Sequence, residues 1–341
     1  MNVESSVGES KSRSLLGWFL KALVALIVTA VALWWSISDV PLDKVKERLF
    51  ETKWSIVALY LFAQFLVHAI RTIRWGLLVR PLGQPSYRAI FSAASVGIPA
   101  AMFLPLRLGE FVRPVMIKRA GVPFASGLAS VVVERAVDGL TNVGLFFVLL
   151  SQLPANADVP SEIRVGAKIA LIIFGGGCGA LLMISYIGDK AIDWIHRLLG
   201  RFSMSVATKV SELLESFLVG LKSLANPKHA LSFIMLTIAY WGVNGFVTAL
   251  LIQSYGIDVP LLAGPFTVSV LVFAVMVPAG PAFIGPMQAG FRAGLAAYAV
   301  SATEALVVGI TAHLATVVCF SVILAAGFLA APKAKNRIPN H

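Results

Sequence analysis

The sequence predicts an all-α membrane protein, a polytopic helix bundle with about six full crossings and two re-entrant hairpins. Hydrophobic residues make up 58% of the chain and charged residues 13%, against about 45–50% and about 25% in soluble globular proteins. Six apolar runs are long enough to cross a bilayer, which takes about 20 helical residues. Two further apolar runs are broken by Gly and Pro. Broken backbone at membrane depth is costly unless it lines a polar cavity, so these two runs point to a transport site.

The predicted crossings are apolar runs bounded by charged or turn-forming residues. The first contains Ala30-Val31-Ala32, which resembles a signal-cleavage site, but the run is longer than a typical signal core. Trp34 and Trp35 lie in it where an interfacial aromatic belt would be, so we expect an uncleaved anchor. The crossings are predicted at 15–37, 54–79, 122–151, 163–187, 229–253 and 303–330.

The two broken runs are predicted to be hairpins at 86–120 and 260–300. A shift of about 175 residues lays the first half of the chain onto the second with the same order of elements. An odd number of crossings separates the halves, so they would be inserted with opposite orientation. The sequence thereby allows an inverted repeat, the arrangement of many transporters.

Basic loop residues predict that both termini lie in the cytoplasm. Lys and Arg gather in the loops on one side, whereas the stretches 152–162 and 253–260 contain neither. The short loop before residue 54 disagrees, although its acidic residues balance its basic ones. We expect a cytoplasmic tail at 1–14, one integral membrane domain at 15–331 and a cytoplasmic tail at 332–341. The net charge of +11 is explained by these loops, so no nucleic-acid partner is expected.

Between residues 188 and 228, apolar residues recur at helical spacing with charged residues opposite, from Val206 to Leu224. This pattern predicts an amphipathic helix. Two placements stay open: the helix lies in the membrane interface or extends a crossing, or it is a connector packed on the bundle.

The first cluster of charged residues begins where the first broken run ends. Arg107, Glu110 and Arg113 recur every three residues and therefore share one helix face. Arginine offers a planar fork that binds two phosphate oxygens at once, and a helix N-terminus opened by Pro105 adds amide donors. We expect an anionic head-group site here. The alternative is an ordinary basic helix attracted to anionic lipid at the interface.

The second cluster is Glu134, Arg135 and Asp138, deep inside a predicted crossing. Ionisable groups at such depth cost about 2.5–3.5 kcal/mol each and usually mark a pathway or a partner. Arg135 would join the head-group cavity and Glu134 would relay a proton or ion. A structural ion pair that locks helices together is the alternative.

Arg71 and Arg74, at the end of the second crossing, are further candidates, although snorkelling at the cytoplasmic boundary also explains them.

At these positions the chain resembles the flippase-like family that includes the transmembrane region of lysylphosphatidylglycerol synthases. The resemblance implies a polytopic inner-membrane protein with re-entrant segments, which in some members moves a modified phospholipid or polyprenyl-linked lipid between leaflets. The chain departs from the family pattern at Gln288, where Glu is expected, and this loses a charge that a proton relay would need. No aminoacyl-transfer domain is expected after Pro332, so lipid lysylation is not expected. The resemblance rests on Arg71, Arg74, Trp75, Leu104, Pro105, Arg107, Gly109, Glu110, Arg113, Glu134, Arg135 and Asp138.

The leading hypothesis is a lipid translocase that moves an anionic phospholipid or polyprenyl-linked lipid and is not an enzyme. A membrane-embedded transferase is the first alternative, with Asp189 and Asp193 as its acidic pair; an accessory subunit of a lipid-modifying complex is the second.

No cofactor or metal site is expected, because Cys178 and Cys319 lie in apolar runs and the His residues are scattered. The expected partners are an anionic membrane lipid and either a second copy of the chain or a lipid-modifying enzyme. The expected substrate-binding residues are Arg71, Arg74, Arg107, Glu110, Arg113, Glu134, Arg135, Asp138 and Gln288.

Overall fold

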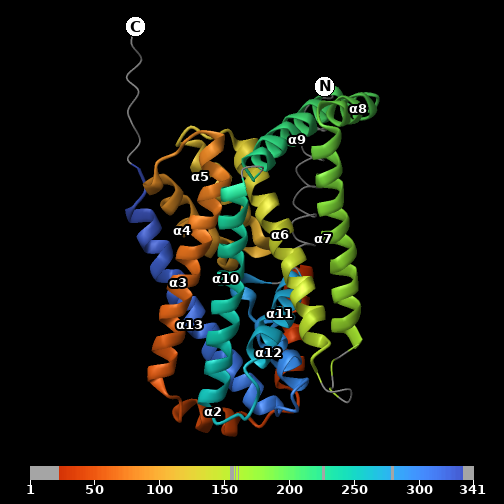
Figure 1. Ribbon diagram of the computed structural model, residues 1–341. Helices are drawn as coiled ribbons and strands as arrows, with labels where there is room; N and C mark the ends of the chain where they lie inside the picture. Colours follow the sequence, from red (N-terminus) through yellow and green to blue (C-terminus); the bar gives the residue numbers. More distant parts are fainter. Residues whose placement is uncertain are drawn as a thin grey trace, which may run out of the picture.

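The computed structural model describes residues 23–153, 157, 159, 161–224, 227–277 and 280–332. These residues form a helical bundle that contains no strand, as the composition predicted. Most long helices run roughly parallel to one axis, α9 (Met204–Leu224) runs obliquely at the upper end, and α2 (Leu42–Phe50) lies across the lower end of the bundle (Figure 1). The predicted tails, residues 1–14 and 332–341, lie outside the described residues except for Pro332.

The first half of the chain contains a short surface helix, a long helix, two helices joined by an irregular turn, and a second long helix. They are α2 (Leu42–Phe50), α3 (Trp54–Val79), η1 (Arg80–Leu82), α4 (Tyr87–Phe103), η2 (Pro105–Phe111), α5 (Val112–Lys118) and α6 (Phe124–Leu150). An N-terminal helix, Leu23–Ile37, precedes them.

The second half repeats this order after three connecting helices. The connecting helices are α7 (Ser161–Ile187), α8 (Asp189–Gly200) and α9 (Met204–Leu224), and the repeated elements are α10 (Pro227–Ser254), α11 (Ala263–Met276), η3 (Pro281–Phe283), α12 (Pro286–Ala296) and α13 (Ala302–Leu329). Where both ends are described, the predicted crossings agree with these helices within the one or two residues by which helix ends are defined.

Three helices in the described part of the chain are long and apolar enough to span a membrane, namely Trp54–Leu82, α10 and α13. The pair Leu23–Ile37 and α2 would be a fourth span if its 81° bend lies within one crossing. Helix α6 is 27 residues long, but Glu134, Arg135 and Asp138 give it more charge than a lipid-facing span tolerates. It therefore needs the shelter of the other helices.

The segment predicted at 86–120 is a hairpin that opens at the upper end of the bundle. Helix α4 ends at Phe103, and η2 and α5 return along it (Figure 1). The close approach requires glycine: a Cβ on Gly109 would lie 2.0 Å from the Ala100 carbonyl carbon, and one on Gly97 would lie 2.3 Å from Cγ of Arg113. The two arms therefore pack backbone to backbone.

The segment predicted at 260–300 is a second hairpin, which opens at the lower end. Helices α11 and α12 pack antiparallel, with Gly290 against Leu271 and Gly294 against Thr267 (Figure 1). The N-terminal helix packs on the turn of this hairpin, where the Gly280 amide donates to Thr29 Oγ1 at 2.8 Å.

The helix contacts pair up as an inverted repeat requires. Helix α4 packs on α13 just as its counterpart α11 packs on α6, and α3 packs directly on its own counterpart α10. The two hairpin turns also share a register, because Arg107 and Phe283 each follow a proline by two residues, precede a glycine by two, and have φ of 56°. Both halves thus place a residue of positive φ at the matching position of the turn, although Ala282 and Gly285 give the second turn two further positive φ values.

The amphipathic pattern from Val206 to Leu224 forms α9, and α8 precedes it in the same 188–228 connection. Helix α9 packs along α6 and buries Ala207 and Leu218. The packed connector is therefore the placement that the structure shows for α9. Helix α8 packs mainly on α9 and leaves Trp194 exposed.

Candidate functional site

The turns of the two hairpins meet near the middle of the bundle. Arg107, in the first turn, donates from Nη2 to the carbonyl oxygen of Val275 at 2.7 Å. Its guanidinium also lies 5.4 Å from the ring centroid of Phe283, in the second turn. One side chain of the first repeat therefore connects the two repeats.

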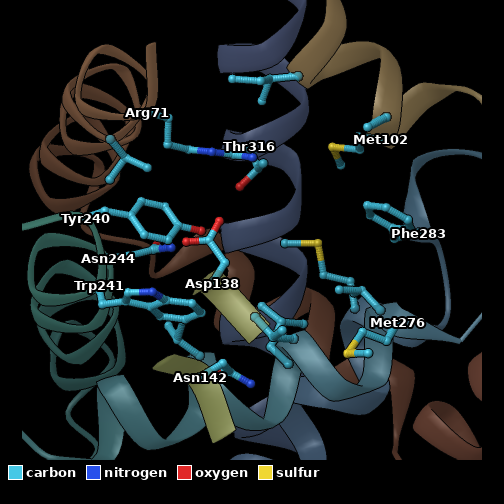
Figure 2. Close-up of a pocket in the computed structure, with 18 of the residues that line it drawn as sticks. Arg71, Met102, Asp138, Asn142, Tyr240, Trp241, Asn244, Met276, Phe283 and Thr316 are labelled. Carbon is cyan, nitrogen blue, oxygen red and sulfur yellow. The ribbon is translucent and has the colours of Figure 1, made fainter. Parts of the chain in front are cut away.

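A cavity of about 410 Å³ lies beside this contact. Pockets for small ligands usually measure about 300–1,000 Å³, so the cavity is large enough for a lipid head group. Its charged lining comes from α3, η2 and α6, and α10 contributes Tyr240, Trp241 and Asn244 to its aromatic and amide lining (Figure 2). The lining charged residues are Arg71, Arg107, Glu110, Arg135 and Asp138.

Glu134 lies at the centre of an ion-pair network behind the cavity. It accepts from Arg74 Nη2 at 3.1 Å and from Arg113, and all three side chains are buried. Arg74 also forms a bidentate pair with Asp138, at 2.6 and 2.8 Å. Removing either partner of such a buried pair leaves an uncompensated charge, which costs about 3–5 kcal/mol. The network therefore joins α3, α5 and α6 tightly.

Glu110 and Arg135 extend the network to the cavity wall. Glu110 accepts from Arg113 Nη2 at 3.0 Å, and one of its oxygens lies 3.8 Å from Arg135 Nη1. Arg135 also lies 3.4 Å from Asp138, but its Nη2 makes no hydrogen bond with good geometry among the described residues. Arg135 thus keeps donor capacity for a ligand.

Arg71 and Arg107 make no ion pair with any residue that the structure describes. Arg71 lies over the Tyr240 ring at 5.7 Å and extends across the cavity toward Thr316 (Figure 2). The site combines three carboxylates (Glu110, Glu134, Asp138) with five guanidiniums (Arg71, Arg74, Arg107, Arg113, Arg135). The excess positive charge faces the cavity.

Gln288 does not line the cavity and lies in the first turn of α12, beside the turn of the second hairpin. Its Oε1 accepts from the Gly285 amide at 2.9 Å, and its Nε2 donates to His313 Nδ1 at 2.9 Å. His313 in turn donates to the carbonyl of Ala282 at 2.8 Å. Gln288 therefore holds the turn that presents Phe283.

The structure places eight of the nine predicted site residues in the cavity wall or directly behind it and separates the ninth, Gln288. Five of the eight face the cavity, while Arg74, Arg113 and Glu134 are buried behind it. A role in substrate binding stays a prediction for all nine. Within the described residues, no group of His, Cys, Asp and Glu could hold a metal ion.

Sequence reasoning missed the wall that α10 contributes. Tyr240, Trp241 and Asn244 line the cavity, as does Asn142 of α6. One signal was present: Asn142 follows Arg135 by seven residues, which places both on the same face of one helix. In α10, Tyr240, Trp241 and Asn244 are polar side chains within a long apolar run.

Residues 22–325 match the family described as the lysylphosphatidylglycerol synthase TM region. The chain belongs to this family. As a protein of the lysylphosphatidylglycerol synthase TM family with membrane-length helices, it is a multi-pass membrane protein. No solved structure matches the chain.

Two curated proteins are similar to this family member. One is the UPF0104 membrane protein of Methanothermobacter thermautotrophicus, 22% identical over 258 residues, which are 72% of each chain. The other is Glycosyltransferase AglD of Haloferax volcanii, 28% identical over 272 residues, which are 72% of this chain and 44% of AglD. The chain thus spans less than half the length of AglD. The name of AglD overturns the expectation that the chain is not an enzyme, because a relative of the same membrane region is a named glycosyltransferase.

Proposed function

We propose that this family member binds the anionic head group of a membrane lipid in the central cavity and moves that lipid between leaflets. The observation that carries the proposal is the pair of guanidiniums, Arg71 and Arg107, that reach the cavity without a carboxylate partner among the described residues. The cavity lies where two hairpins from opposite ends of the bundle meet. That is the position of the substrate site in transporters with inverted repeats.

Electrostatics favours an anion as the ligand. Charges inside a membrane protein are normally paired, because an unpaired charge in a low-dielectric surrounding is costly. Phosphate oxygens suit guanidinium forks better than any neutral group does. A phospholipid or polyprenyl-linked lipid would place its phosphate beside Arg71, Arg107 and Arg135 and leave its hydrocarbon tails in the bilayer.

The charge distribution supports a membrane orientation for this function. Arg119, at the end of α5, belongs to the upper end of the bundle, together with the basic residues of α8 and α9. The positive-inside rule places this end in the cytoplasm. We therefore propose an inner-membrane protein with cytoplasmic termini, which acts with an anionic lipid and with a second copy or a lipid-modifying enzyme as partner.

The translocation proposal is tested in proteoliposomes that contain chain-labelled phosphatidylglycerol or polyprenyl phosphate. The wild-type protein should move at least one of the two lipids faster than empty vesicles do. Arg71→Gln and Arg107→Gln each remove a charged donor, worth about 1.5–3 kcal/mol, so transport should fall by about tenfold to a hundredfold.

The matched control is Arg119→Gln, which removes the same charge from an exposed position outside the cavity. It should transport like the wild type. If the wild-type protein accelerates neither lipid, the translocation proposal fails. If Arg71→Gln and Arg107→Gln transport as well as the control does, the cavity is not the site.

A second candidate function is glycosyl transfer with a lipid substrate, which the name of AglD favours. Of the acidic pair predicted for a transferase, Asp193 is exposed on α8 and does not line the cavity, and the side chain of Asp189 lies outside what the structure describes. A transfer reaction would instead use the carboxylates Glu110 and Asp138. Incubation of the purified protein with a radiolabelled polyprenyl-phosphate sugar and membrane lipids tests this candidate. A new labelled product that is absent with Asp138→Asn would support transfer, and no product would contradict it.

A further inference from the structure

The cavity has two chemically different sides. Arg71 lies at its upper end, while Trp241 and Asn142 lie at its lower end, with Tyr240, Asn244 and Asp138 between them (Figure 2). The guanidiniums account for a phosphate, but they do not account for the aromatic and amide side. That side needs a ligand group of its own.

On the aromatic and amide side, Trp241 has a buried hydrogen-bond donor without an acceptor in the described part of the chain. Its indole N–H is buried and has no hydrogen-bond partner among the described residues, and the residue is only 6% exposed. A buried Trp N–H normally finds a partner, because an unmade hydrogen bond costs stability. Since Trp241 lines the cavity, a ligand can supply the missing acceptor.

The neighbours of Trp241 are fixed in position and keep spare hydrogen-bonding groups. The Tyr240 and Trp241 rings pack edge to face, with centroids 5.0 Å apart. Asn244 accepts from Gln64 Nε2 at 3.4 Å, and its own amide nitrogen donates to no described residue. Asn142 is held by Ser269, whose Oγ donates to Asn142 Oδ1 at 3.1 Å. The wall is therefore a rigid set of aromatic faces and amides.

From this juxtaposition we propose that the cavity recognises a sugar attached to the lipid phosphate, so that the ligand is a glycosylated polyprenyl phosphate. Sugar hydroxyls both donate and accept hydrogen bonds, which matches an indole donor beside amide groups, and the C–H faces of a sugar pack on aromatic rings. A lipid with a bare phosphate leaves these buried groups unpaired, and sites of this kind reject such analogues. The proposal rests on the proposed lipid-binding function and adds the head group.

The test measures binding of three lipids to the detergent-purified full chain by native mass spectrometry: polyprenyl phosphate, glucosyl polyprenyl phosphate and phosphatidylglycerol. The glucosylated lipid should bind at least about tenfold more tightly than either of the others. Trp241→Phe, which keeps a ring but removes the N–H, should weaken binding of the glucosylated lipid by about fivefold to tenfold and leave binding of polyprenyl phosphate unchanged. Asn244→Ala should act in the same way.

Trp194→Phe on exposed α8 is the matched control and should bind all three lipids like the wild type. Equal binding of glucosylated and bare polyprenyl phosphate overturns the sugar inference but leaves the proposed function standing. Tighter binding of phosphatidylglycerol than of the glucosylated lipid overturns the inference in the same way. If none of the three lipids binds, the proposed function fails as well.

Discussion

At the scale of single residues, Glu134 shows how position decides the role of a charged group. The sequence suggested either an ion relay or a structural pair for this carboxylate. In the structure it is fully buried and contacts Arg74, Arg113 and Arg135. Its negative charge therefore compensates guanidiniums that would otherwise repel one another. This geometry favours the structural role.

Glu134→Gln should consequently destabilise the folded protein by about 3–5 kcal/mol, because it leaves Arg74 and Arg113 without their shared carboxylate. Unfolding of the detergent-solubilised protein, followed by tryptophan fluorescence, measures the change. Glu51→Gln, at a surface-exposed ion pair with Arg48, is the control and should change stability by less than about 1 kcal/mol. Equal stability of Glu134→Gln and the wild type would contradict the structural role.

The charged residues of the site could be predicted because they interrupt apolar runs. A charged group inside a membrane segment is costly, so it usually has a partner or a function. The division between cavity residues and buried residues could not be predicted. Arg71 and Arg74 are three residues apart on α3, yet Arg71 reaches the cavity and Arg74 turns to Asp138. That difference depends on how α3 packs against α6 and α10. Trp241 was missed for the same reason, since the sequence does not show which residues an aromatic side chain in a crossing contacts.

At the scale of elements, the first hairpin depends on the absence of side chains at two positions. Gly109 lies against the Ala100 backbone and Gly97 against Arg113. The sequence showed where the run breaks, because Gly and Pro interrupt helices in recognisable ways. It did not show that the two arms touch along their length, because such contacts join residues that are distant in sequence.

Gly109→Ala should therefore destabilise the protein, by at least the about 1–3 kcal/mol typical of overpacking, since the added Cβ meets backbone rather than a movable side chain. Gly144→Ala in α6 is the matched control, because the space around Gly144 is open. That change should be neutral or stabilising by up to about 1 kcal/mol, as alanine is the better helix former. A thermal-stability assay in detergent compares both variants, and a Gly109→Ala variant as stable as Gly144→Ala would argue against this packing.

At the scale of the whole molecule, the turns of the two inverted repeats contact each other but carry chemically different side chains. The turn of the first copy supplies Arg107, and the turn of the second supplies Phe283 at the matching position. The order of elements allowed this repeat to be predicted, because the two halves share the same order and spacing of crossings and broken runs even where their residues differ. The sequence could not show that the two turns touch, since only the folded bundle brings residues 107 and 275 together.

The proposed orientation predicts which end of the bundle faces the cell exterior. In a background with Cys178 and Cys319 replaced by Ala, a membrane-impermeant maleimide should label Lys53→Cys in spheroplasts. It should label Arg119→Cys only after permeabilisation. Both positions are exposed in the structure, so accessibility to the reagent reports the side of the membrane. The reverse labelling pattern would invert the topology.

Because Arg107 both faces the cavity and donates to Val275 of the opposite hairpin, it cannot give the same hydrogen to a cargo and to that carbonyl. A guanidinium carries five N–H groups, so an anion bound by the others can leave this hydrogen bond intact, whereas an anion that takes this hydrogen would separate the two repeats. Without a bound anion, the hydrogen bond between the two repeats stays in place. The position at which the anion binds would then decide whether the two repeats stay joined.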